Sequence, residues 1–479
     1  MKKISIDPVT RVEGHGKVTL YLDENNEIAD SRLHIVEFRG FEKFVQGRPY
    51  WEAPVLVQRL CGICPVSHHI AAAKAIDKLL DLDPQDLTPV ADKMRRLMHY
   101  AQVLQSHALH FFYLAAPDFL LGANDNLPSR SVVGLIHEHP ELAKKGVLIR
   151  KFGQELIEAT AGKRIHGTGA IPGGINKNLS IKRRDKFLNN VVNINTIVHW
   201  CKEAIDMLKN YHQTRVNQID NFVEFPSNYL SLVRNDGALE FYDGGLRAKD
   251  KEGKIIFDHE DNQKYHELIA EGVKNWSYMK FPYIRSIGPE KGWYRVGPLA
   301  RLNNADFIPT PLAQEEFENF KQYTNGRPNS MCLHTHWARL IEMLHSAEVV
   351  KGLLKDSDLQ GKNLTVKKGF RGEGVGIIEA PRGTLFHHYK ANKEGKLTMA
   401  NLIVSTTGNN EPMNRSVNQV AKRVFTGKKE ITYEMKNAVE IAIRAYDPCL
   451  SCATHALGKM PLEIELYDVY NKLIHRYIS

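Results

Sequence analysis

The chain has 479 residues, of which 43% are hydrophobic, so it can bury a large core in one extended domain or two. Its net charge is +9, but 64 basic and 55 acidic residues are interspersed, which argues against nucleic-acid binding. Six cysteines are too few for a secreted disulfide framework, and no apolar run reaches the length of a membrane span. These features favour a cytoplasmic protein with no membrane span.

The predicted strands fall into three regions of the chain. Residues 18–22 and 28–36 form the first region, and the polar turn between them predicts a surface hairpin. Residues 229–258 predict a glycine-punctuated β excursion, which is the best candidate for an insertion or a partner-facing element. Residues 369–390 predict a further β segment.

The predicted helices are long. Apolar side chains recur every three or four residues at 97–111 and again at 187–208, and each run predicts one long helix with a buried stripe. The glycine-rich segment 161–174 lacks the spacing of a phosphate-binding loop and is interpreted as a structural loop. Together these patterns predict an α+β fold that is mainly helical. We expect a core bundle of long helices with small peripheral β-sheets or hairpins.

Two Cys-x-x-Cys pairs stand near opposite ends of the chain. Cys61 and Cys64 form the first pair, and Cys449 and Cys452 form the second. Each pair can chelate one soft metal, and four thiolates suffice for tetrahedral zinc or iron or for a binuclear centre. The spacing alone leaves open a single zinc site and two unrelated redox or structural thiol pairs. Cys201 and Cys332 stand alone and are expected to be buried and inert.

The residues around the second pair predict a helix start. Asp447 is expected to be the N-cap and Pro448 the first helical residue, so that Cys449 and Cys452 would share one face of the opening turns. The helix dipole there would favour the thiolate form that a metal needs.

The sequence blocks around the thiols resemble the large subunit of nickel–iron hydrogenases. The likeness runs over essentially the whole chain and looks most like the soluble, cytoplasmic, NAD-linked branch. It is carried by the R-x-C-G-x-C-x-x-x-H block at 59–68, the D-P-C-x-x-C-x-x-H block at 447–455, and further blocks at 7–15, 39–42, 297–301 and 379–383.

The resemblance implies a nickel–iron centre on the four cysteines, with carbonyl and cyanide ligands on iron. Cys61 and Cys449 would be terminal nickel ligands, whereas Cys64 and Cys452 would bridge nickel and iron. Hydrogen would be split heterolytically and reversibly, with hydride at the metals and the proton passing to a thiolate. Glu13, by itself an ordinary turn residue, would be the next proton acceptor.

Further residues gain roles from the same likeness. Arg382 would overhang the open metal position, and Asp118 would pair with it. His68 would hydrogen-bond a bridging thiolate, where spacing alone suggests a capping or core histidine. Glu42 and His455 would hold Mg²⁺.

Three more residues are implied to border the cofactor. Ser405 or Thr406 would donate a hydrogen bond to a diatomic ligand on iron, and Pro381 would contact the cofactor beside Arg382.

Electrons would leave through partner subunits, because no cysteines remain here to bind iron–sulfur clusters. The resemblance implies a small subunit with an iron–sulfur cluster, and diaphorase subunits that bind NAD and flavin. It also implies nickel-insertion proteins and a maturation endopeptidase. The endopeptidase would leave residues 1–455 as the hydrogenase domain and remove the extension 456–479. Residues 461–466 alternate like a strand, so the extension could hold the preceding turn away from its final place.

Three alternatives remain at this point. An NADP-linked sulfhydrogenase subunit would share the metal centre and differ in the acceptor. The homologous quinone-site subunit of respiratory complex I would lack the paired cysteines that this chain contains. A zinc-stabilised structural protein would leave Glu13, Glu42 and Arg382 unexplained.

Overall fold

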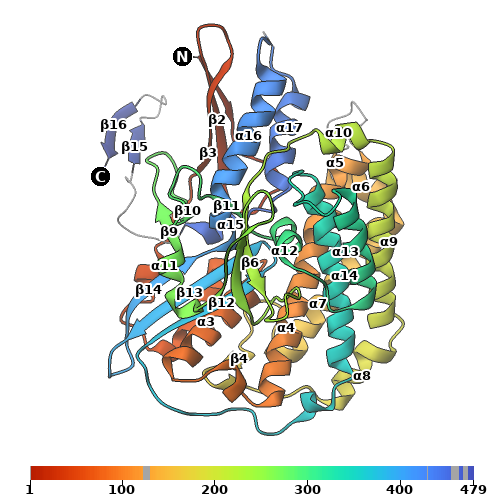
Figure 1. Cartoon of the computed structure of the whole chain (residues 1–479), viewed down its shortest axis with the longest axis vertical. Coiled ribbons are helices and arrows are strands. Elements are labelled where there is room, and N and C mark those ends of the chain that lie inside the picture. Colours follow the sequence, from red (N-terminus) through yellow and green to blue (C-terminus); the bar gives the residue numbers. More distant parts are fainter. Residues whose placement is uncertain (1, 122–129, 429, 455–462, 468–472, 479) are drawn as a thin grey trace.

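The computed structural model describes residues 2–121, 130–428, 430–454, 463–467 and 473–478. Helices dominate, and several small sheets lie around them (Figure 1). The expected α+β, mainly helical class is confirmed. Within the described part of the chain, no helix is both long and apolar enough to cross a bilayer.

The N-terminal region forms an antiparallel sheet in the order β1-β2-β3. Its strands are β1 (Lys2–Ile6), β2 (Gly16–Leu22) and β3 (Ile28–Ile35), so the expected hairpin is confirmed. The buried face of this sheet shares one hydrophobic core with α16 (Asn410–Phe425) and α17 (Tyr433–Arg444). The two ends of the sequence therefore pack together.

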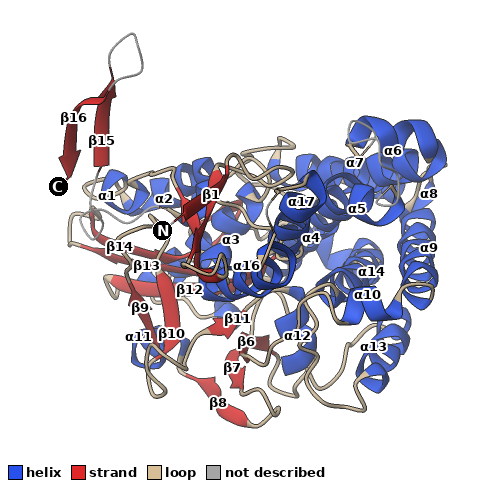
Figure 2. Ribbon diagram, turned by 90° about the horizontal axis from the view of Figure 1, so that it is seen from above, coloured by secondary structure: helices blue, strands red, loops and turns tan. Residues whose placement is uncertain are grey.

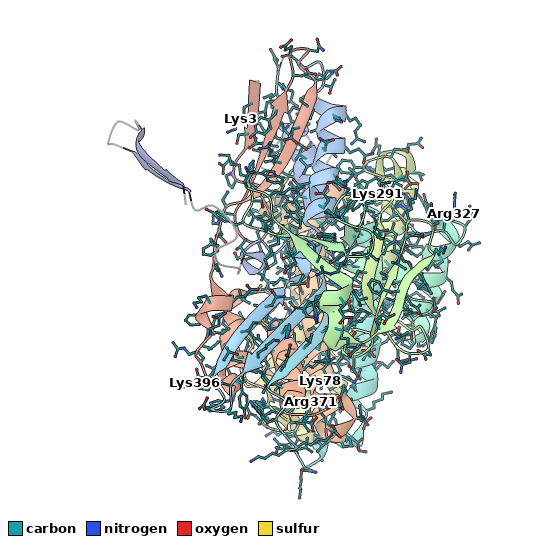
Figure 3. The ribbon with its side chains drawn as sticks, turned by 60° about the vertical axis from the view of Figure 1, so that its left-hand side comes forward. Lys3, Lys78, Lys291, Arg327, Arg371 and Lys396 are labelled. Atoms are coloured by element: carbon teal, nitrogen blue, oxygen red, sulfur yellow. The ribbon has the colours of Figure 1, made fainter. Side chains whose placement is uncertain are left out.

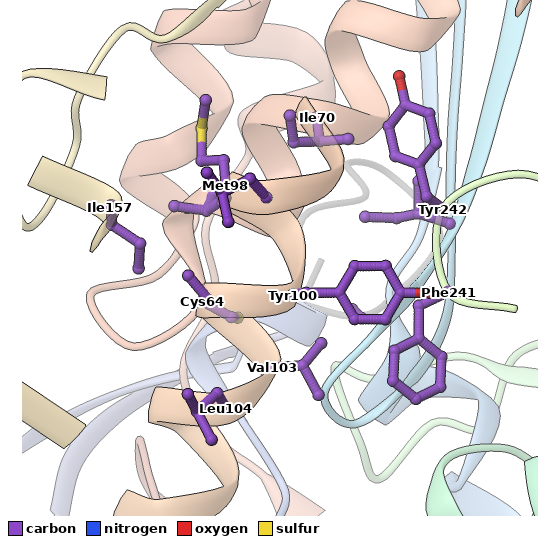
Figure 4. Packing of buried hydrophobic residues seen from close by; sticks show 14 of the residues in the cluster. Cys64, Ile70, Met98, Tyr100, Val103, Leu104, Ile157, Phe241 and Tyr242 are labelled. Carbon is purple, nitrogen blue, oxygen red and sulfur yellow. The ribbon is translucent and has the colours of Figure 1, made fainter. Parts of the chain in front are cut away.

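Four long helices form the bundle at the other side of the molecule (Figure 1). They are α4 (Pro89–Leu109), α7 (Pro140–Ala161), α9 (Ile194–Gln213) and α14 (His334–Leu354). The sequence sets the start of α4, because the Thr88 side chain accepts the backbone N–H of Ala91 and proline occupies the first helical position. Figure 4 shows Cys64 in the apolar cluster of this bundle, with Val103 and Leu104 of α4 nearby.

The single helix expected over 187–208 is two helices, so that expectation is wrong. The first helix, α8 (Ile181–Asn189), ends before Val191, which is 95% exposed and belongs to no buried stripe. A new helix then begins because the Asn193 side chain accepts the backbone N–H groups of Asn195 and Thr196. Apolar spacing continued across the break and concealed it.

Helix α3 (Pro65–Leu79) is buried on nearly every face. One side packs on an antiparallel sheet of order β12-β13-β14. Its strands are β12 (Glu373–Ala380), β13 (Gly383–Ala391) and β14 (Leu397–Ile403), which confirms the expected β segment.

Two glycines on β12 allow this close packing. A Cβ atom at Gly374 would lie 2.2 Å from the carbonyl oxygen of Ala75, and one at Gly376 would lie 2.2 Å from that of Ala71. Any larger residue would push the helix off the sheet. The contact fixes the start of α3 relative to the turn between β12 and β13, and both border the candidate site.

The expected β excursion is also confirmed. It belongs to a four-stranded sheet in the order β11-β6-β7-β8, beside a two-stranded sheet of β9 and β10. Their bounds are β6 (Asn228–Val233), β7 (Gly245–Lys249), β8 (Ile255–Glu260), β9 (Ile269–Gly272), β10 (Phe281–Ile284) and β11 (Tyr294–Arg295). Its role as an insertion or partner-facing element stays a prediction.

Short elements complete the described chain. The helices are α1 (Phe41–Phe44), α2 (Ala53–Leu56), α5 (Ala116–Leu120), α6 (Val132–Glu138), α10 (Val216–Asp220), α11 (Tyr265–Leu268), α12 (Pro298–Asn304), α13 (Pro311–Tyr323) and α15 (Ser405–Gly408). Strands β4 (Ala170–Ile171) and β5 (Gly174–Ile175) pair in the segment interpreted as a structural loop. Figure 3 places labelled basic residues such as Lys3, Lys291 and Lys396 on separate parts of the surface.

The C-terminal extension contains the expected strand. Strand β15 (Glu463–Tyr467) pairs antiparallel with β16 (Leu473–Ile478). Figure 2 shows this hairpin standing apart from the body of the protein.

Candidate metal centre

The four paired cysteines meet at one point inside the protein. The Sγ atoms of Cys61 and Cys449 are 3.3 Å apart although 388 residues separate them, and those of Cys449 and Cys452 are 2.8 Å apart. The Sγ atoms of Cys64 and Cys452 are separated by 3.9 Å. All four thiols are free and buried, and their sulfur atoms lie within 4.8 Å of one another.

The first cysteine pair is shaped by the start of α3. Cys61 follows a short helical segment in an extended conformation, and Cys64 is the N-cap of α3, with Pro65 next. The backbone N–H groups of Ile63 and Cys64 donate to Cys61 Sγ, each at 3.2 Å. Such contacts stabilise negative charge on sulfur.

The helix start expected at Asp447 is absent, so that expectation is wrong. Helix α17 ends at Arg444, Asp447 has a left-handed φ of 53°, and Ser451–Ala453 forms one short 3₁₀ turn. Asp447 does not cap a helix because its side chain accepts a hydrogen bond from Arg382 instead, at 2.9 Å. The second pair is therefore held by long-range contacts and not by a helix dipole.

Glu13 provides one of these long-range contacts. Its carboxylate Oε2 lies 2.9 Å from Cys449 Sγ and accepts the backbone N–H of Ser451 at 3.2 Å. Its carbonyl oxygen accepts the backbone N–H of Leu450 at 3.0 Å. The next residue must be glycine, because Gly14 has a φ of 81° and a Cβ there would lie 2.7 Å from the Ser451 nitrogen.

Arg382 covers the thiols from the turn between β12 and β13. Its Nε donates to the Asp447 carbonyl oxygen at 2.6 Å, and its side chain is only 3% exposed. Among the described atoms, Nη1 of Arg382 has no hydrogen-bond partner, although it is buried. Arg382 lines a small cavity together with Cys64, Cys449 and Cys452, so the site keeps a donor free for a group that the protein does not supply.

Asp118 does not pair with Arg382, which corrects the expected pairing. It forms ion pairs with Arg11 and Arg444. The partner of Arg382 is Asp447, which stands two positions before Cys449 and is nearer in the fold. The arginine and carboxylate are 65 residues apart in sequence, and local patterns gave no signal for this pair.

The other expected cofactor-binding residues line the same cavity. His68, Pro381, Ser405 and Thr406 all border it. Thr406 Oγ1 accepts the backbone N–H of Cys449 at 3.0 Å, so it also positions that thiol.

Sequence reasoning missed one residue behind the cavity. Nε2 of His387, on β13, lies 3.1 Å from Nδ1 of His68, and Nδ1 of His387 lies 2.7 Å from the Tyr389 hydroxyl. These contacts fix the orientation of the His68 ring. The alternation of the strand could have placed His387 and Tyr389 on one face, but not beside His68.

Glu42 lies in α1, near Thr454, the last described residue before the gap at 455–462. Its Oε1 accepts the backbone N–H of Leu402 at 2.8 Å, and the backbone N–H of Arg39 donates to the Thr454 carbonyl oxygen at 2.7 Å. His455, the other expected Mg²⁺ ligand, lies outside the described residues.

The protonation of the four thiols is uneven. Burial alone would raise the pKa of Cys61, but hydrogen bonds from Cys449, Cys452 and Cys64 and the charge of Arg382 outweigh it and lower that pKa. Burial raises the pKa of Cys449 and Cys452. A bound cation would stabilise the thiolate form of all four, and four soft sulfur ligands in a dry pocket fit nickel, iron or zinc.

Comparison with known proteins identifies the family. Residues 39–124 and 205–455 match the family described as nickel-dependent hydrogenase, and residues 3–38 match one described as HoxL-like. The chain therefore belongs to the nickel-dependent hydrogenases.

Individual relatives are similar over nearly the whole chain. The beta subunit of the NAD-reducing hydrogenase HoxS of Cupriavidus necator is 50% identical, covering 99% of each chain. One component of the F420-non-reducing hydrogenase of Methanothermobacter thermautotrophicus is 41% identical, covering 99% of this chain and 100% of that one. A solved NAD⁺-reducing [NiFe]-hydrogenase in the H₂-reduced state is 52% identical with a TM-score of 0.92. The match covers 95% of this chain and 100% of the chain in the solved structure.

Family membership decides between the alternatives raised by the sequence. A zinc-stabilised structural protein and a quinone-site subunit of complex I are both excluded. The four cysteines, the unpaired Arg382 nitrogen and the nearby Glu13 carboxylate form a donor set and cavity that fit a nickel–iron group.

Proposed function

We propose that this chain is the catalytic subunit of an NAD-linked nickel–iron hydrogenase, which converts H₂ reversibly to protons and electrons. The observation that carries the proposal is the buried four-thiol cluster with the Glu13 carboxylate 2.9 Å from Cys449 Sγ. NAD is favoured as the acceptor because the NAD-reducing relative is more similar than the F420-non-reducing one, at 50% against 41% identity.

The cysteines have distinct roles in this proposal. Cys61 and Cys449 would bind nickel alone, and Cys64 and Cys452 would bind both nickel and iron. When bound, the nickel–iron group, with carbonyl and cyanide on iron, supplies the soft Lewis-acid and redox chemistry that splits hydrogen.

Proton movement is assigned to Cys449 and Glu13. The Cys449 thiol faces Glu13 Oε2 at 2.9 Å, which is within hydrogen-bond reach for a proton transfer between the two. Arg382 presents a permanently charged group over the cavity, with Nη1 free to face a ligand.

The remaining predicted residues support this arrangement. His68 would tune a bridging thiolate, and Pro381, Ser405 and Thr406 would surround the iron ligands. Asp118 would act through its ion pairs with Arg11 and Arg444, close to the chain that carries Cys449. Glu42 and His455 would hold Mg²⁺.

The proposal includes partner proteins and a cytoplasmic location. Cys201 and Cys332 are buried, and burial raises the pKa of both, so neither suits an iron–sulfur cluster. We therefore infer a small subunit with an iron–sulfur cluster, and diaphorase subunits with flavin that pass electrons to NAD. Maturation would require nickel-insertion proteins and an endopeptidase that removes residues 456–479.

The experiment is metal analysis of the complex from a maturation-competent host, with infrared spectroscopy and hydrogen-dependent reduction of NAD⁺ and NADP⁺. We expect one nickel and one iron per chain, iron-bound carbonyl and cyanide bands, and NADH formation. Reduction of NADP⁺ alone would favour the sulfhydrogenase alternative. One zinc without these bands would overturn the proposal.

A further inference from the structure

A second group of ligand-type side chains lies in the helical bundle, in segments that contribute nothing to the cysteine cluster. His212 is near the C-terminal end of α9, Asp220 ends α10, and His334 begins α14. One imidazole nitrogen from each histidine and one carboxylate oxygen of Asp220 lie within 4.8 Å of one another. Three helix ends thus bring nitrogen and oxygen donors to one point.

The donor atoms face one another. Asp220 Oδ1 is 2.7 Å from His212 Nε2 and 3.0 Å from His334 Nε2. The Tyr323 hydroxyl, at the end of α13, donates to Asp220 Oδ2 at 2.5 Å and lies 3.3 Å from His212 Nε2. Two imidazoles, a carboxylate and an optional oxygen are the ligand set of divalent transition metals, and Zn²⁺ favours it in tetrahedral geometry.

The Nε2 protons of the two histidines now point to the Asp220 carboxylate, so they must leave or move to Nδ1 when a metal binds. Burial lowers the pKa of His334, which favours the neutral imidazole. Burial would raise the pKa of Asp220, but hydrogen bonds from His334, Tyr323 and His212 outweigh it and keep the carboxylate ionised. The nearby Lys209 adds no uncompensated charge, because its Nζ lies 3.1 Å from a Glu316 carboxylate oxygen.

The surroundings hold the two imidazoles in place. The Asn329 amide nitrogen lies 2.8 Å from His334 Nδ1, while its oxygen accepts the backbone N–H of Met331 at 3.1 Å. The His212 and His334 rings lie 4.9 Å apart between centroids, and Trp337 packs edge-on to His334. A small cavity borders both histidines and is lined by Phe119, Leu208 and other apolar side chains.

We propose that His212, Asp220 and His334 form a second metal site, which binds one divalent transition-metal ion of the Zn²⁺ class with Tyr323 or water as the fourth ligand. Only small outward shifts of the three side chains are needed to admit an ion at zinc–nitrogen and zinc–oxygen distances. The ion would tie α9 and α10 to the first turn of α14, so its role is structural. The competing interpretation is a hydrogen-bonded cluster around Asp220 that binds no metal.

The test compares zinc uptake by the purified full-length chain and by its Asp220→Asn variant. Both proteins keep the four cysteines, so any difference isolates the second site. Asparagine has the shape of aspartate and keeps an acceptor oxygen, so the fold is retained while the anionic ligand is lost. The matched control is His199→Gln, because His199 lies on α9, is exposed, and among the described residues has an ion pair with Glu203 at 3.4 Å.

We expect the wild-type chain and His199→Gln to retain one more equivalent of zinc than Asp220→Asn and His334→Gln after gel filtration. Cobalt bound at this extra site should show no thiolate charge-transfer band, which separates it from the cysteines. Equal zinc content in the wild-type chain and Asp220→Asn would overturn the proposal.

Discussion

At the residue scale, Glu13 is the sharpest test of the proposed proton transfer. Glu13→Gln keeps the shape of the side chain and the hydrogen bond from Ser451 but removes the proton acceptor beside Cys449. We expect hydrogen-dependent NAD⁺ reduction to fall by about 10²- to 10⁴-fold, the usual contribution of a general base.

The measurement pairs activity with nickel and iron content, since the cysteines are intact and the metals should remain. The control is Glu24→Gln, a change in the exposed turn between β2 and β3. Full activity of Glu13→Gln would show that the proton leaves Cys449 by another route.

Substitution of Arg382 tests whether the site needs a rigid guanidinium group above the cavity. Arg382→Lys keeps the charge, but one ammonium cannot reproduce the two hydrogen bonds to Asp447 and also leave a donor free. We expect kcat to fall by about 10²- to 10³-fold, as for the loss of one pre-organised donor. The control is Arg371→Lys, an exposed ion pair with Asp81, and a variant as active as wild type would contradict the assigned role.

Cysteine spacing pointed to the four thiols, and the resemblance to a known family pointed to Glu13, because both are visible along the chain. They failed for contacts between distant residues. The Asp118–Arg382 pair was expected, but Asp118 binds Arg11 and Arg444, while Arg382 binds Asp447. Which carboxylate meets which arginine depends on how α5, α17 and the β12–β13 turn pack, and no local pattern reports that packing.

At the element scale, apolar periodicity predicted helix content well and helix ends poorly. It correctly predicted α4, whose buried face forms the bundle core. It missed the break before Asn193, where a side-chain cap outweighs continued apolar spacing. A helix was also expected at Asp447, whose left-handed backbone and bond to Arg382 prevent one.

A buried charge network links three of these elements. Arg301 of α12 pairs with Glu342 of α14 at 2.6 Å and with Glu379 of β12 at 2.9 Å, and all three side chains are at most 1% exposed. Arg301→Met would leave two buried carboxylates uncompensated, so we expect a loss of about 3–5 kcal/mol in the free energy of unfolding.

Denaturant unfolding measures this loss. Arg234→Met is the matched control, because its ion pair with Asp236 is exposed and such pairs contribute about 0–1 kcal/mol. Equal stability of Arg301→Met and Arg234→Met would contradict the role assigned to the network.

His69 makes stability depend on pH at the junction of α2, α3 and β4. Its Nδ1–H donates to the Pro54 carbonyl at 2.7 Å and its Nε2 accepts the Ala170 N–H at 2.9 Å, an arrangement that requires the neutral ring. Burial lowers the pKa of His69 from 6.5 to about 4. The unfolded chain therefore takes up this proton at higher pH than the folded one.

His69 thus stabilises the fold fully above pH 6.5, and its contribution is lost as the pH falls towards about 4. The slope is up to about 1.4 kcal/mol per pH unit. We measure the free energy of unfolding at several pH values across this window. Its slope against pH should be smaller in His69→Gln than in the wild-type chain, by the equivalent of about one proton taken up on unfolding. An unchanged slope would show that His69 does not titrate on unfolding.

At the scale of the whole molecule, the candidate centre forms where the two large cores meet. The cysteines border the bundle core, and Leu450 and Ala453 between and beside them belong to the core of β1–β3, α16 and α17. Neither cysteine pair can chelate the complete centre alone, so both ends of the chain must be folded together before four sulfurs converge. The centre therefore depends on the packing of the two cores against each other.

The proposed removal of the C-terminal extension makes a prediction at this scale. Its β15–β16 hairpin stands away from the body, while Thr454, just before the extension, is bonded to Arg39 at 2.7 Å. The solved relative corresponds over its whole chain to 95% of this one. We expect intact-mass measurement of the active complex to show a subunit that ends at His455, and nickel-free protein from a host without the endopeptidase to retain residues 456–479. An active, nickel-containing subunit whose mass still includes the extension would contradict this prediction, whatever the order of metal insertion.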